Sequence, residues 1–228
     1  MINSIDDAFV GYGIRRQVRI TIEPSLNCMI IKCTGIPHER ISWTFMTEIT
    51  DKIREIPNHD KSSYYPAGCS RFCGSGGRGK EADGGLAPAG TRDSQDSWPS
   101  IVLEVGDSQR IRALHECAVW WLTESKGQTR MVILIKLTRD PLQLHLELWE
   151  MIPDPSKPST QSREPKIPGF EKYFDIDAEG KITHHKDHPS LTIPYRTIFD
   201  VDHDDATDIT LSHADMKSWA LRLFTGLS

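Results

Sequence analysis

The feature that most limits the fold of this chain is a pair of uninterrupted apolar runs, IVLEV at 101–105 and MVILIKL at 131–137. A strand that is apolar on both faces must be covered on both faces, as in the parallel or mixed sheet of an α/β protein. Between the runs, apolar residues recur at helical spacing over 108–124, and Ser108 can act as the N-cap. The order strand, helix, strand therefore predicts an α/β domain.

The N-terminal half predicts a hairpin, a helix, a loop and a short strand. Residues 14–33 hold two strand-like runs around a turn rich in Pro, Ser and Asn. Residues 37–56 carry an apolar side chain at every fourth position, which indicates a helix. Pro and Gly then crowd residues 57–80, which predicts a long loop, and a strand candidate follows at 83–87.

The C-terminal half predicts attachments to a core that spans residues 1–152. Residues 142–149 alternate strictly, which is typical of an outer strand with one face in water. Residues 153–190 are rich in Pro, Ser, Lys and His and suggest an extended linker or excursion. Residues 191–228 predict short strands and a helix that Ser212 caps and that docks on the core.

Length and cysteine usage indicate where the protein works. The 228 residues include no stretch of the roughly 18 apolar residues that a membrane span needs, and the N-terminus lacks the basic and apolar regions of a signal peptide. Five cysteines are an odd count without an export signal, so we expect reduced thiols. The sequence predicts an intracellular protein, cytoplasmic or nuclear, without a membrane partner.

The charge balance limits how nucleic acid could bind. A net charge of −5 excludes a surface that is basic all over, so any nucleic-acid contact must use a local basic patch. Five residues could form one: Arg15, Arg16, Arg19, Lys126 and Arg130. The alternative is a solvated charged face with no partner.

Glu104 is the most informative single residue, because it lies inside the apolar run 101–105. An ionised carboxylate in such a strand is costly unless a partner compensates its charge. One solution is a structural ion pair with Arg110 or Arg112, and the other is a metal or catalytic site.

A family resemblance favours the second solution. The segments GKEADGGLAP (79–88) and WPSIVLEVGDSQRIRALHECAVWWL (98–122), with HERI at the start of the first predicted helix, carry it. They resemble a group of largely uncharacterised fungal proteins of the PD-(D/E)XK restriction-endonuclease-like type, which share a KE-x-D strand, a strand ending E-V-G and a helix ending W-W-L. The likeness covers roughly residues 12–150. It implies a restriction-endonuclease-like mixed central sheet flanked by helices, with an N-terminal hairpin and a C-terminal helix.

The resemblance also implies a metal site. Asp83 and Glu104 match the two acids that hold Mg²⁺ or Mn²⁺ at one sheet edge, and Glu48 would be an optional third ligand from the helix. The alternative for Glu48 is an exposed acid on an amphipathic helix. If Asp83 and Glu104 faced each other without metal, like-charge repulsion and burial would raise the pKa of the pair.

One motif residue is missing, and this leaves two hypotheses for function. The family's lysine two positions after the Glu is Gly106 here. Four residues could supply the cation instead: Arg110, Arg112, Lys80 and Lys136. Of these, we assign Arg112 of the 108–124 helix to catalysis. The first hypothesis is Mg²⁺-dependent phosphodiester hydrolysis of nucleic acid by a nuclease-like protein with a degenerate site. The alternative is a catalytically inactive binding or interaction module with the nuclease fold.

Overall fold

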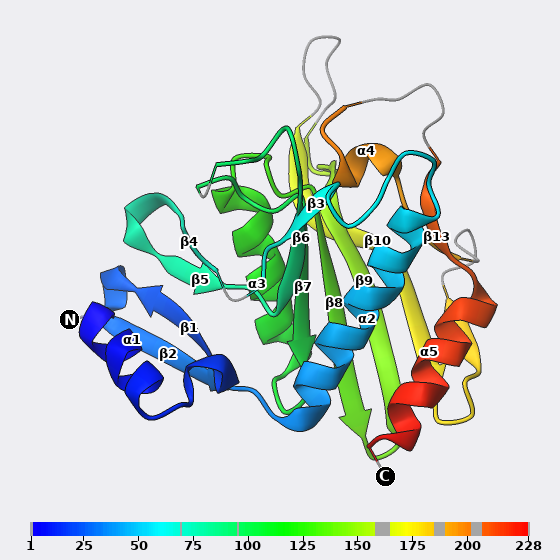
Figure 1. The fold of residues 1–228 in the computed structure, drawn as a ribbon, viewed down its shortest axis with the longest axis horizontal. Coiled ribbons are helices and arrows are strands. Elements are labelled where there is room, and N and C mark those ends of the chain that lie inside the picture. Colours follow the sequence, from blue (N-terminus) through cyan, green and yellow to red (C-terminus); the bar gives the residue numbers. More distant parts are fainter. Residues whose placement is uncertain are drawn as a thin grey trace.

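A computed structural model describes residues 2–68, 70–94, 96–157, 165–184, 190–201 and 207–227. Its centre is a mixed sheet of seven strands in the order β11-β10-β9-β8-β7-β6-β3 (Figure 1). Strands β7 and β8 are parallel, and the other neighbours are antiparallel. The strands are β3 (Tyr64–Pro66), β6 (Gly84–Pro88), β7 (Ile101–Gly106), β8 (Met131–Arg139), β9 (Leu142–Pro153), β10 (Lys166–Asp177) and β11 (Ile182–His184).

Helices cover both faces of this sheet (Figure 1). Helices α2 (Ile36–Arg54) and α5 (His213–Thr225) lie on one face, and α3 (Ile111–Glu124) lies on the other. Successive side chains of β7 point to opposite faces of the sheet: Leu103 packs in the core under α2, and Val102 packs in the core under α3. The predicted α/β class is confirmed, and the strands that hold residues 84–88, 101–106 and 131–139 are neighbours in one sheet.

A second, smaller sheet stands beside the first and has the order β2-β1-β5-β4. The predicted hairpin is its first half, but residues 57–80 are not one loop as predicted, because short strands pair there despite the Pro and Gly content. The chain then passes from β5 through Ala82 and Asp83 into β6 of the large sheet. The elements of this region are α1 (Ile2–Gly11), η1 (Arg15–Gln17), β1 (Val18–Glu23), η2 (Pro24–Leu26), β2 (Cys28–Cys33), β4 (Arg71–Cys73), η3 (Ser75–Gly77) and β5 (Gly79–Glu81).

Two expectations for the C-terminal half are wrong. The segment 153–190 is not simply a linker, since it contains β10 and β11, and Phe174 of β10 is buried against the sheet. β9 is not an outer strand, because β10 pairs with it, and its second face is only partly in water: Glu147 and Trp149 are buried, whereas Gln143 and His145 are half-exposed. Both differences arise from contacts between segments that are separated in the sequence. Local composition does not predict such contacts.

The C-terminal elements pack against the core. After β12 (Leu191–Ile193), α4 (Tyr195–Ile198) and β13 (Ile209–Leu211), Ser212 and Asp215 form a capping box at the start of α5. Trp219 of α5 packs edge-on against Phe45 of α2 with ring centroids 5.0 Å apart. Within the described ranges, no helix combines the length and the apolar character needed to cross a membrane.

Candidate functional site

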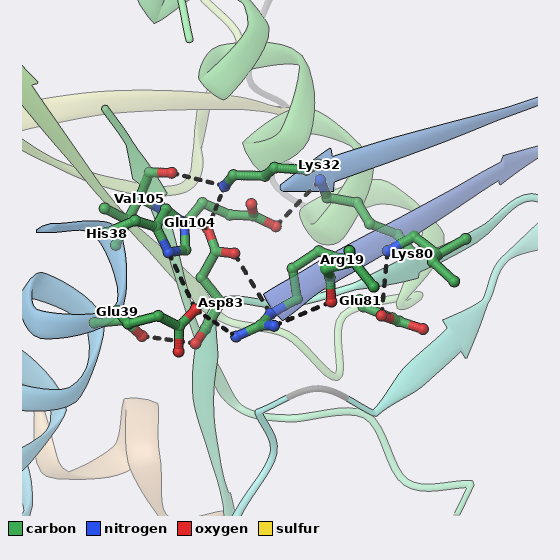
Figure 2. Close-up of polar contacts among 12 residues, drawn as sticks. Arg19, Lys32, His38, Glu39, Lys80, Glu81, Asp83, Glu104 and Val105 are labelled. Carbon is green, nitrogen blue, oxygen red and sulfur yellow. Dashed lines mark hydrogen bonds and ion pairs between the residues drawn. The ribbon is translucent and has the colours of Figure 1, made fainter. Parts of the chain in front are cut away.

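Asp83 and Glu104 lie opposite each other on neighbouring strands. Asp83 directly precedes β6 and Glu104 lies in β7, and the antiparallel register that pairs Gly84 with Leu103 brings the two acids face to face. Both point to the face that α3 and the small sheet share, amid several basic side chains (Figure 2). Their exposed fractions are only 6% and 2%. Burial of two acids at one point requires strong compensation.

Four nitrogen groups surround the Asp83 carboxylate, and Lys32 and Val105 donate hydrogen bonds to it. Its Oδ2 lies 2.6 Å from Lys32 Nζ and 3.1 Å from His38 Nε2, and it accepts the Val105 N–H at 2.8 Å. Arg19 Nε lies 3.8 Å from Oδ1. Burial alone would raise the pKa of Asp83, but the charges and hydrogen bonds of Lys32 and His38 outweigh it and hold this pKa well below its usual range.

Glu104 is compensated by a buried lysine and an indole. Lys80 Nζ lies 3.2 Å from Oε1, and Trp121 Nε1 donates to the same oxygen at 2.7 Å. Lys80 also donates to Cys117 Sγ at 2.9 Å. Burial favours the neutral amine, but the charge of Glu104 outweighs it, so the pKa of Lys80 is raised above its ordinary value. Burial raises the pKa of the Cys117 thiol, although Lys80 partly opposes this.

These contacts contradict the expected like-charge repulsion. The folded pKa of Asp83 is lowered rather than raised, because a cation stands beside each carboxylate. Sequence reasoning named Lys80 only as one of four candidates, and it missed Lys32 and His38. A lysine inside the apolar run CMIIKC is a usable signal for Lys32, whereas His38 carries no comparable signal.

Two predicted site residues lie elsewhere. Glu48 forms an ion pair with Arg222 of α5. It follows His38 by ten residues on the same helix, a rise of about 15 Å, so it is far from Asp83. Arg112 has a side chain that is 90% exposed, and it pairs with Glu116 on the surface of α3. Neither residue shares a contact with the two acids among those the structure describes.

Most residues of the predicted basic patch form ion pairs with acids of the same chain. Three of its members bind acids of the same chain: Arg15 binds Glu81, Arg19 binds Glu39, and Arg130 binds Asp200. Lys126 is exposed, and the side chain of Arg16 lies outside the described residues. The nucleic-acid contact predicted for these residues therefore has no support from their arrangement.

A cavity of about 630 Å³ opens onto Glu104 and onto Lys32 and His38, the two side chains that contact Asp83. Residues of β2, α3 and the connection between β7 and α3 form its walls. Glu104 and Lys80 lie in its lining together with Lys32 and His38. The cavity has the volume of a site for one small ligand, which is about 300–1,000 Å³.

The carboxylate pair can accommodate a hard cation. Mg²⁺ typically uses one or two protein carboxylates and keeps several waters or substrate phosphates. Asp83 Oδ1 accepts no hydrogen bond from the described residues. No group of three or more His, Cys, Asp or Glu in the described ranges has the geometry of a metal site. An ion at Asp83 and Glu104 would therefore depend on water or phosphate for its remaining ligands, and Lys32 would have to release Asp83.

Gly106 stands where the family's lysine is expected, and its surroundings exclude a side chain. A Cβ at this position would lie 2.8 Å from Leu114 Cδ1 and 3.4 Å from Lys136 Cδ. Leu114 is fully buried, so it cannot easily move away.

We therefore expect Gly106→Ala to lower the free energy of unfolding by about 1–3 kcal/mol, as overpacking does elsewhere. Gly106→Lys should be at least as destabilised, and it should not restore a missing catalytic group. Urea denaturation measures both, with Gly11→Ala as the control because, among the described residues, no atom outside the helix backbone lies within 4 Å of a Cβ at Gly11. Variants at position 106 as stable as the parent would contradict the packing described here.

Comparison with known proteins adds no family. No family model matches the chain, and no curated protein matches it significantly.

Proposed function

We propose that this chain is a metal-dependent phosphodiesterase of the PD-(D/E)XK nuclease type that acts on nucleic acid. Asp83 and Glu104 would hold Mg²⁺ or Mn²⁺, and Lys80 would replace the lysine that is absent at position 106. The observation that carries the proposal is the 3.2 Å pair between Lys80 and Glu104, opposite Asp83 and at the lining of a cavity.

The arrangement of elements supports the finer assignment of a restriction-endonuclease-like fold. The motif places one acid before a strand and the other within the next strand of the sheet. Here Asp83 precedes β6, Glu104 lies in β7, and these strands are neighbours. One helix precedes this pair and another follows it.

Each residue of the site would have a distinct role. A bound Mg²⁺ or Mn²⁺ would polarise the scissile phosphate and lower the pKa of a bound water. Lys80 is held by Glu104 and Cys117, so its ammonium group is oriented before substrate binds and can stabilise negative charge on the phosphate. Lys32 balances the charge of Asp83 and could transfer its hydrogen bonds to a phosphate oxygen.

The test is cleavage of single- and double-stranded oligonucleotides with Mn²⁺. The parent should cleave slowly, and Lys80→Met should lower the rate by about 10²–10³, as the loss of one oriented donor does elsewhere. Lys61→Met is a matched control at an exposed lysine and should cleave like the parent. Equal rates for the parent and Lys80→Met would exclude the role of Lys80.

Metal binding is tested separately from catalysis. Above its Kd, each tenfold rise in free Mn²⁺ should add about 1.4 kcal/mol to the stability of the parent. Asp83→Asn should show little of this effect, and EDTA should remove it from the parent. Thermal melts give this readout even if cleavage is undetectable. A parent that Mn²⁺ does not stabilise would exclude the metal site.

A catalytically inactive binding module is the second candidate. It is favoured by the ion pairs themselves, because Lys32 and Lys80 already balance the two acids without any metal. This candidate requires that Mn²⁺ neither stabilises the protein nor supports cleavage. The melts described above distinguish the two functions.

A further inference from the structure

Glu104 lines the cavity, and Asp83 lies behind two other lining residues, Lys32 and His38, which contact its carboxylate. Asp83, Glu104 and Lys80 are each less than 8% exposed. The walls of the cavity come from the small sheet on one side and α3 on the other. A phosphate that enters between these two elements meets Lys32 and Lys80 beside the carboxylates.

The charges in the cavity suit a short ligand. Its cationic lining consists of Lys32, Arg78 and Lys80, and its acidic lining consists of Glu104, Asp107 and Glu116. The two sets balance, and the whole chain has a net charge of −5. Binding of a long nucleic-acid backbone rests on many uncompensated Lys and Arg contacts. This site can attract one or two phosphates, with a metal adding positive charge.

A double helix does not meet these limits. Duplex DNA is a stiff rod with a persistence length of about 150 bp. The phosphates lie on the outside of a duplex, but the carboxylates that would hold the metal are buried, so a nucleotide has to leave the helical stack for its phosphate to reach them. A single strand can bend sharply, and one of its nucleotides is of a size that the cavity of about 630 Å³ can hold.

One wall of the cavity offers apolar contacts beside the cations. Ile30 and Ile31 of the edge strand β2 line it and are 57% and 42% exposed. Lys32 follows them directly and reaches Asp83. Apolar side chains next to a cation suit an extruded base and its phosphate, because pockets that accept such a base hold it between aromatic or apolar side chains.

We infer that the substrate reaches the site as single-stranded nucleic acid, with one nucleotide inserted into the cavity between β2 and α3. This inference rests on the proposed function and specifies its substrate class. It assigns Ile30, Ile31 and Ala113 to contacts with the inserted nucleotide.

Binding measured without cleavage tests the inference. Fluorescence anisotropy would compare a labelled single strand of roughly 20 nucleotides with the blunt duplex of the same sequence, at low salt and with Ca²⁺ as the oxygen-seeking cation. The single strand should bind about tenfold more tightly than the duplex, since only it can enter the cavity.

Two tryptophan substitutions on α3 make a matched pair. Ala113→Trp would fill the cavity and should weaken single-strand binding by about tenfold. Val119→Trp lies on the same helix, outside the cavity lining, and should change binding by less than about twofold. Thermal melts verify that both variants are folded.

The outcomes separate the inference from the proposed function. Equal binding of the single strand and the duplex, or Ala113→Trp binding like the parent, would overturn the inference while Mn²⁺-dependent cleavage would still support a nuclease. If neither nucleic acid binds and neither is cleaved with Mn²⁺, both the inference and the proposed function are excluded.

Discussion

Glu104→Gln should lower the free energy of unfolding of the metal-free protein by about 3–5 kcal/mol at neutral pH, the cost of breaking a buried ion pair. Lys80 is 7% exposed and lies 3.2 Å from the carboxylate. The amide cannot balance the ammonium charge, although it can still accept from the Trp121 indole. For a chain of this length the midpoint of thermal unfolding should fall by roughly 6–20 °C.

A double-mutant cycle isolates the pair from its surroundings. Lys80→Met should also be destabilised, because it leaves Glu104 buried without its cation. The double variant Lys80→Met/Glu104→Gln should be less destabilised than the sum of the two single variants, because neither buried charge then remains. Glu116→Gln is the control, since its carboxylate is exposed on α3.

The result also separates two states of the site. A Glu104→Gln variant as stable as the metal-free parent would mean that Lys80 does not pair with Glu104 in solution. That outcome would support the alternative in which Asp83 and Glu104 repel each other in the absence of a metal ion. Additive effects in the cycle would likewise contradict the ion pair.

Glu147→Gln should have the second-largest effect. Glu147 Oε1 lies 2.9 Å from His145 Nε2, and Oε2 lies 2.9 Å from His115 Nε2 and accepts from Trp149 Nε1 at 2.6 Å. His145 Nδ1 lies 2.7 Å from Asp175. These contacts tie α3 to β9 and β10. Their loss should cost about 2–3 kcal/mol near pH 6, less than a fully buried pair because both imidazoles are partly exposed.

The pH dependence of this effect has a defined sign. The hydrogen bond with Glu147 outweighs burial and raises the pKa of His145, so its stabilisation is complete below about pH 6.5 and is lost as pH rises through the folded pKa. Burial would raise the pKa of Glu147, but His145, Trp149 and His115 lower it. Its stabilisation is therefore present above about pH 4.3 and is lost as pH falls through the lowered folded pKa.

The difference in stability between the parent and Glu147→Gln should thus be largest between about pH 4.3 and 6.5. Urea denaturation of both proteins near pH 5.5 and pH 8.5 would measure it. Asp177→Asn provides a control, because Asp177 is near the end of β10 and binds only backbone N–H groups of its own turn among the described contacts. A difference that stays constant or grows toward pH 8.5 would contradict the paired imidazoles.

The sequence alone determined the elements whose signal is local. The apolar runs at 101–105 and 131–137 predicted β7 and β8, because burial on both faces leaves no polar alternation. The helical spacing of Ile41, Phe45 and Ile49 predicted α2, and the residues after Ser212 predicted the cap and the helix α5. Glu104 inside an apolar strand indicated that it needs a partner.

Only the tertiary structure decided which partner that is. Lys80, Lys32 and His38 come from β5, β2 and α2, and the junction between the two sheets brings them to the acids. Local sequence patterns cannot predict such contacts, because the partner of a buried acid depends on which strands and helices lie beside it in the fold and not on its neighbours in sequence. The position of Glu48 is a second example. Helical periodicity predicted which face of α2 holds Glu48, but only the structure shows that Glu48 lies ten residues beyond His38, far from Asp83. The segment 166–177 forms strand β10 despite nearby prolines because its backbone pairs with β9.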